Sequence, residues 1–66
     1  MNWDQIEGKW KQAAGAAKAH WGKLSSDEVD QVDGNRQRLE GLIQERYGVA
    51  KEDAQKQVDE WLETRH

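Results

Sequence analysis

The side chains that could do chemistry in this chain of 66 residues are two histidines, two adjacent serines and many carboxylates. Asp59, Glu63 and His66 follow one another at helical spacing, so one helix face could carry all three. A metal site needs three or four ligands on a rigid frame with supporting contacts, and a histidine at the chain terminus would lie on a fraying turn. We therefore interpret this face as a solvated helix end and predict no metal site.

His20 and the adjacent serines are the remaining candidates for acid–base or nucleophilic catalysis. His20 lies just before Trp21 at the predicted end of a helix, where the helix dipole favours an imidazolium. Ser25 and Glu28 have the spacing of a capping box, which explains the serine without a catalytic role. Because no second histidine lies in a predicted structured region to act as a base, we predict no catalytic residue.

Cofactor sites are not expected either. The six glycines are too far apart for a phosphate-binding loop and lack the following Lys-Ser/Thr pair. Carboxylate pairs such as Asp27–Glu28 and Asp59–Glu60 fall on faces that we expect to be solvated. A domain of this size can hardly enclose the few hundred Å³ that small-molecule sites occupy. We predict a protein that is not an enzyme and that binds no cofactor.

The tryptophans are the best candidates for recognition. Helical spacing predicts that Trp10, Trp21 and Trp61 form core, but a shallow, open bundle would expose some of these rings. They would then offer an interaction surface for an amphipathic partner helix or for self-association. Four lysines lie near Trp10 and Trp21, yet the acids that flank them would repel phosphate. Nucleic acid is therefore not an expected partner.

Composition limits the class of protein. Hydrophobic and charged residues each make up 35% of the chain, the mean hydropathy is −1.20 and the net charge is −3. No apolar run approaches the roughly 18–20 residues that span a membrane, and the first ten residues do not resemble a secretory signal. The absence of cysteine excludes disulfides and mildly favours the cytoplasm. The length suits one domain, residues 1–66.

Caps, glycines and apolar spacing predict four helices and an all-α fold. The first begins at Asn2 or Asp4 and ends near His20 or Trp21. A short second helix follows the Ser25 capping box, and the remaining two cover residues 35–47 and about 51 onward. Neither proline nor two-residue alternation interrupts them. The expected inner faces are Trp3, Ile6, Trp10, Ala13, Ala17 and Trp21, then Val29 and Val32, then Leu39, Leu42, Ile43 and Tyr47, then Ala54, Val58, Trp61 and Leu62.

The two halves of the sequence match at an offset of 26 residues. Gly8, Gly15 and Gly22 correspond to Gly34, Gly41 and Gly48, and four further positions are identical. This pattern indicates an internal duplication, with coincidence in a low-diversity helical sequence as the alternative. It predicts two open helical hairpins that pack together. We expect the mid-helix glycines to permit close helix–helix approach, with weak helix propensity as the other explanation.

The stretches GKWKQAAGAAKAHWGKLSSDE and GNRQRLEGLIQERYG resemble the CsbD-like family of small bacterial stress-response proteins. The resemblance covers essentially the whole chain, with departures at Ala13 and Asn35. It implies a fold of four helices in two open hairpins and production under general, osmotic or envelope stress. It supplies no catalytic residue.

Two functional hypotheses follow from these observations. The first is a non-enzymatic stress protectant similar to the hydrophilins, consistent with the mean hydropathy of −1.20 and the lack of a site. The alternative is an interaction module that binds a partner helix through an exposed groove of tryptophan and leucine side chains.

Overall fold

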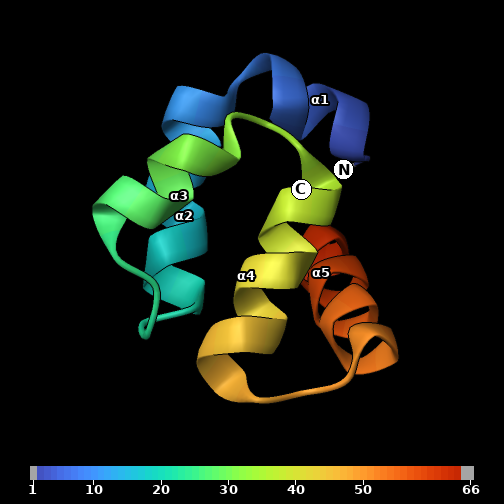
Figure 1. Cartoon of the computed structure of the whole chain (residues 1–66). Helices are drawn as coiled ribbons and strands as arrows, with labels where there is room; N and C mark the ends of the chain where they lie inside the picture. Colours follow the sequence, from blue (N-terminus) through green and yellow to red (C-terminus); the bar gives the residue numbers. More distant parts are fainter. Residues whose placement is uncertain (1, 65–66) are drawn as a thin grey trace.

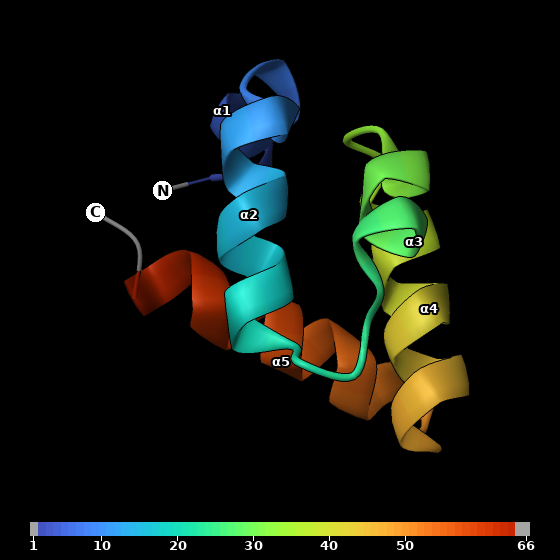
Figure 2. The same ribbon diagram turned by 90° about the vertical axis from the view of Figure 1, so that its left-hand side faces the viewer.

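The computed structural model describes residues 2–64, which form five α-helices and no β-strand (Figure 1). The all-α prediction is therefore confirmed for this part of the chain. Helix α2 packs on α3 and α4 packs on α5, while α3 contacts α4 and α1 contacts α2. In Figure 2, α5 runs from the foot of α4 beneath the end of α2. The helices are α1 (Trp3–Gly8), α2 (Trp10–His20), α3 (Ser26–Val32), α4 (Arg36–Tyr47) and α5 (Lys51–Thr64).

The prediction of four helices is wrong, because the first predicted helix is divided at Lys9. This residue has φ −123° and ψ 34°, outside the helical region, and its N–H donates to the carbonyl of Ile6. Gly8, a poor helix former, ends α1. The break gives α1 and α2 different directions, and each places an indole N–H on a different carbonyl. Trp3 donates to Gly34 at 2.8 Å and Trp10 donates to Val29 at 3.1 Å.

The predicted caps are confirmed. The Asn2 side chain accepts from the N–H of Gln5 at the start of α1. At the start of α3, the Ser25 hydroxyl accepts from the N–H of Glu28, whose carboxylate accepts from the N–H of Ser25. These bonds satisfy amide donors that have no partner inside the helix. Gly48 ends α4 in the left-handed region at φ 65°.

The turn between α3 and α4 is tight. Asp33 has φ 50°, an uncommon conformation for a residue with a side chain, and Gly34 has φ 80°. A Cβ added at Gly34 would lie 3.0 Å from Cγ and 3.3 Å from the carbonyl oxygen of Glu7. Glycine is therefore required here both by the backbone conformation and by the contact with α1.

The apolar side chains converge on one core. Leu39 and Ile43 on α4 and Ala54 and Val58 on α5 are fully buried, as predicted, whereas Leu42 is half-buried. Partial exposure of Leu42 follows from its position on the side of α4 that faces a surface groove. The buried apolar residues are Ile6, Trp10, Ala13, Ala14, Ala17, Trp21, Leu24, Val29, Val32, Leu39, Ile43, Ala54, Val58, Trp61 and Leu62.

Close packing does not explain the mid-helix glycines. A Cβ added at Gly15 or at Gly41 would meet no neighbouring atom within 4 Å, apart from its own helix backbone. Both positions are exposed, because each glycine lies on the outer side of its helix. The expectation of close helix–helix approach at these residues is therefore wrong.

Ion pairs link α4 to both α3 and α5. Arg46 on α4 forms an ion pair with Glu28 on α3. Arg36, at the start of α4, binds Asp59 on α5 at 2.6 Å. In each pair a base on α4 meets an acid on one of the two helices that pack against it.

Candidate functional site

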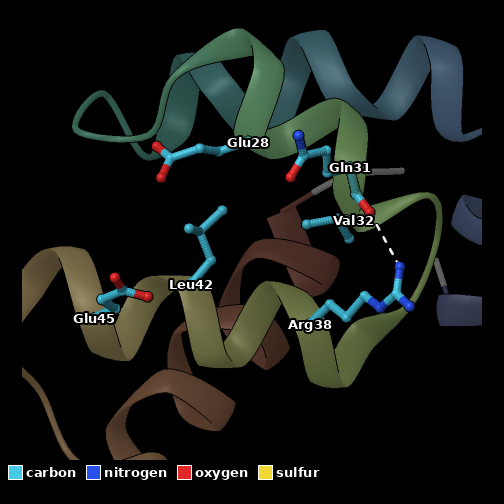
Figure 3. A pocket seen from close by; sticks show the side chains of 6 residues that line it. All are labelled: Glu28, Gln31, Val32, Arg38, Leu42 and Glu45. Atoms are coloured by element: carbon cyan, nitrogen blue, oxygen red, sulfur yellow. Dashed lines mark hydrogen bonds between the residues drawn. The ribbon is translucent and has the colours of Figure 1, made fainter.

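A surface groove lies between α3 and α4 (Figure 3). Its volume is about 520 Å³, and it is open to solvent rather than enclosed. Figure 3 shows Leu42 pointing from α4 across the groove toward α3, where Val32 lies. Polar side chains form the rest of the lining. The lining residues are Glu28, Gln31, Val32, Arg38, Leu42 and Glu45.

Ion pairing and hydrogen bonding engage much of this polar lining. Nε of Arg46 donates to Oε2 of Glu28 at 2.8 Å, and a second guanidinium nitrogen contacts the same oxygen. These hydrogen bonds, together with that from the N–H of Ser25, hold the pKa of Glu28 below its ordinary value. Across the groove, Arg38 donates to the carbonyl of Gln31 at 3.3 Å. Glu28 is therefore an ion-pair acceptor in its charged form, not a proton donor.

The residues that line this groove are suited to binding another molecule. Its lining contains carboxylates, an amide, a guanidinium and two aliphatic side chains, and it contains neither a histidine nor a hydroxyl nucleophile. Leu42 gives an apolar contact, while Glu45 and Arg38 are exposed charges at its edge. An extended or helical segment with one apolar side chain could lie along it.

The predicted interaction residues Trp10, Trp21 and Trp61 lie in the core, with exposures of 8%, 2% and 2%. The rings of Trp21 and Trp61 meet edge-on, 5.2 Å apart, whereas Trp10 packs on Trp3 at 5.8 Å. Their burial is the outcome that helical spacing predicts. None of the three lines the groove between α3 and α4, whereas Trp10 lines a separate surface hollow at the start of α2.

The other candidate residues from the sequence lie at helix ends or on the surface. His20 is exposed at the end of α2, and its imidazole meets the Trp21 ring edge-on at 4.6 Å. Ser25 caps α3. Of the predicted acid–histidine face, Asp59 pairs with Arg36 and Glu63 is exposed, while His66 lies outside the described residues. Among residues 2–64, no three His, Cys, Asp or Glu side chains are arranged to hold a metal ion.

A buried carboxylate was not anticipated from the sequence. Glu40 on α4 is 5% exposed, and its Oε2 lies 2.7 Å from Nε of Arg36. The same guanidinium donates to Asp59 and, at 3.3 Å, to the carbonyl of Gln55. Burial acts to lower the pKa of Arg36, but the hydrogen bonds to Asp59 and Glu40 outweigh it and raise the pKa. The four-residue spacing of Arg36 and Glu40 could have indicated their ion pair from the sequence. The ion pair between Arg36 and Asp59 could not be predicted in this way, because it depends on how α5 packs on α4.

None of the helices within residues 2–64 combines the length and the apolar character that crossing a bilayer requires.

The CsbD-like family model matches residues 4–56. A UPF0337 protein of Bordetella pertussis is 56% identical over 63 residues, which cover 96% of each chain. A UPF0337 protein of Pectobacterium atrosepticum is 52% identical over 61 residues, 92% of this chain and 88% of the relative. The UPF0337 protein YjbJ of Escherichia coli K12 is 48% identical over 66 residues, 100% of this chain and 94% of the relative.

No solved structure matches this chain. The family model covers most of the sequence and the relatives align over nearly their full lengths. The chain therefore belongs to the CsbD-like family.

Proposed function

We propose that this protein is a non-enzymatic, cytoplasmic component of the bacterial general or osmotic stress response that protects other macromolecules, as hydrophilins do. One observation carries the proposal: most large apolar side chains of residues 2–64 are in the core and the others are partly buried against it, so most exposed residues are charged or polar. The charged fraction of 35% and the mean hydropathy of −1.20 describe the same property. Membership of the CsbD-like family supports the link to stress.

The physical basis of protection is a surface that stays hydrated and does not adhere. A net charge of −3 on a small chain favours hydration and solubility as water becomes scarce. Such a molecule, placed between partly unfolded proteins, separates their exposed apolar surfaces and slows aggregation. This activity needs surface charge and abundance, and it needs no pocket.

A drying assay tests the proposal. A labile enzyme is dried and rehydrated with this protein or with an equal mass of albumin, and the recovered activity is measured. The matched variant carries Asp30→Asn, Glu45→Gln and Glu60→Gln, which remove three exposed charges outside the core. We expect the wild type to protect better than albumin and better than this variant. Recovery equal to that with albumin would refute a specific protective role.

The groove between α3 and α4 favours a second candidate function, an interaction module for an amphipathic partner helix. Half-buried Leu42 is its apolar contact and Glu45 its exposed charge. Affinity capture with the wild type and with Leu42→Gln would test this function, and Gln12→Ala, an exposed change on α2, is the control. A partner retained by the control and lost with Leu42→Gln would support it. No difference between the two variants would count against it.

Internal duplication is a further part of this proposal, and two hydrogen bonds support it. Trp10 donates to the carbonyl of Val29, and Arg36 donates to the carbonyl of Gln55, each across 19 residues. Both donors begin a helix that packs on the next one, and the two pairs are offset by 26 residues, as the glycines are. If duplication is correct, the sequences of relatives should match at this offset more often than shuffled sequences of the same composition.

A further inference from the structure

The chain consists of two helical units joined by one short turn. Helices α1–α3 form the first unit and α4–α5 the second, and the turn between them is residues 33–35 (Figure 1). Buried side chains of both units belong to one hydrophobic core. Separating the units therefore exposes apolar surface on each of them.

The contacts between the units lie away from the turn. Trp21 of the first unit meets the Trp61 ring at 5.2 Å and donates to Gln57 at 3.0 Å. The backbone N–H of Lys23 donates to the hydroxyl of Tyr47 at 3.1 Å. Glu28 and Arg46 add an ion pair between the units. Since none of these bonds uses residues 33–35, the second unit of another copy can form all of them equally well.

The turn itself is the strained part of the chain. Asp33 is the one residue with a side chain that has a positive φ among residues 2–64, and Gly34 follows it at φ 80°. Gly34 also packs against Glu7, with no space for a Cβ. Straightening this segment removes the positive φ of Asp33 and breaks three hydrogen bonds that depend on the closed turn. They run from Trp3 to the Gly34 carbonyl, from the N–H of Asn35 to the Val32 carbonyl and from Arg38 to the Gln31 carbonyl. Short, strained connections of this kind favour exchange of units between copies.

The helical phase continues through the turn. Val29, Val32, Arg36, Leu39 and Ile43 are separated by steps of three, four, three and four residues. This repeat keeps one face of a single helix, although in the structure its members belong to two helices. No proline prevents residues 26–47 from forming one helix. Such a helix would be about 33 Å long at 1.5 Å per residue, which exceeds the 27 Å longest dimension of the folded chain.

A straightened helix therefore holds the two units of one chain apart. The ring of Trp21 then loses Trp61 of its own chain, and both apolar faces become exposed. The occupant that fits these faces is a second copy, because it carries the same Trp61, Gln57 and Tyr47 in the same arrangement. We propose that this protein forms a domain-swapped dimer, in which α3 and α4 join into one helix and α1–α3 of each copy pack on α4–α5 of the other.

A single substitution distinguishes the closed monomer from the domain-swapped dimer. Gly34→Ala is disfavoured in the closed turn by the positive φ and by Glu7, whereas in a continuous helix alanine is preferred to glycine. Destabilisation of the closed turn and stabilisation of the continuous helix both favour the dimer, and each applies to both of its chains. We expect the dimerisation constant to rise by about a hundredfold or more. Gly41→Ala is the matched control, because it strengthens α4 at an open position without touching the turn.

Light scattering coupled to size-exclusion chromatography gives the mass, and circular dichroism gives the helix content. A helical dimer for Gly34→Ala, with a smaller dimer fraction for Gly41→Ala and for the wild type refolded at millimolar concentration, supports the proposal. A helical monomer for Gly34→Ala overturns it. If Gly34→Ala is not helical, the wild type decides: it is refolded at millimolar concentration, and the absence of any dimer there overturns the proposal.

Isotope-filtered NMR distinguishes exchange of units from simple side-by-side association. The dimer is refolded from a mixture of ¹³C-labelled and unlabelled chains, and contacts between the rings of Trp21 and Trp61 are measured. Exchange requires these contacts to join a labelled to an unlabelled chain. Contacts confined to one chain would mean that the closed fold persists, and the proposal would be wrong.

Discussion

Nε1 of Trp21 donates a hydrogen bond to Oε1 of Gln57 at 3.0 Å, and this bond joins the end of α2 to the middle of α5. The indole is 2% exposed, so its N–H requires a protein acceptor. Its ring also meets Trp61 edge-on at 5.2 Å. Trp21 thus contributes both apolar burial and a polar contact where the two helical units meet.

Replacing Trp21 with phenylalanine should lower the free energy of unfolding by about 2–3 kcal/mol, because it removes buried volume and leaves the Gln57 amide without its donor. Urea denaturation followed by far-UV circular dichroism measures this loss. Trp3→Phe is the control, since Trp3 also donates one hydrogen bond but is only half-buried. We expect the control to cost about 1 kcal/mol. Equal losses would show that burial of Trp21 is not decisive.

Arg36→Met should lower the free energy of unfolding by about 2–3 kcal/mol, because it leaves the buried Glu40 carboxylate without its cation. The double variant Arg36→Met/Glu40→Leu removes both charges and should recover most of that loss. Arg38→Met, a change at an exposed arginine, is the control and should stay within about 0.5 kcal/mol of the wild type. If the double variant did not regain the lost stability, the contacts of Arg36 with Asp59 and Gln55 would account for most of the loss.

Stability should fall in acid partly through Glu28. Its pKa is lowered from the ordinary 4.5, first by the Arg46 side chain and then by the Ser25 N–H. A carboxylate with a lower pKa in the folded state stabilises the fold above pH 4.5, and this contribution disappears as the pH falls through the folded-state pKa. Denaturation curves at successive pH values should therefore show a shallower acid dependence for Glu28→Gln, which keeps an acceptor for the cap. Arg46→Gln should reproduce the shallower curve, and an unchanged slope in both variants would contradict this assignment.

Gly15→Ala and Gly41→Ala should each raise the free energy of unfolding by about 1 kcal/mol, because the added methyl meets open space and alanine is the better helix former. Gly48→Ala should lower it, since φ is 65° there and the helix cap requires the left-handed region. Thermal unfolding of the three variants measures the effect. A loss of stability for Gly15→Ala or Gly41→Ala would point to a neighbour that the closed fold does not place there.

Local chemistry determined most of the secondary structure. The capping residue Ser25 and the terminator Gly48 act within three or four residues of the chain, so the sequence alone located those helix ends. At the first helix the sequence left Asn2 and Asp4 as alternatives, and the structure shows that Asn2 is the cap. The sequence did not predict the break at Lys9. The spacing of apolar residues continues unchanged through Lys9, so it does not indicate a break. In the structure the break accompanies hydrogen bonds from Trp3 and Trp10 to carbonyls that are distant in the sequence.

The candidate site depended on the tertiary structure. Spacing showed that Trp10, Trp21 and Trp61 are on inner faces, but it could not show how closely the helices would cover them, because coverage depends on crossing geometry. The same geometry leaves Leu42 beside a groove and brings Asp59 to Arg36. The sequence by itself determined an all-helical chain with a charged surface, since periodicity and capping are local properties. Only packing decided which charges pair, which rings are buried and where a hollow remains, because those depend on residues that meet across different helices.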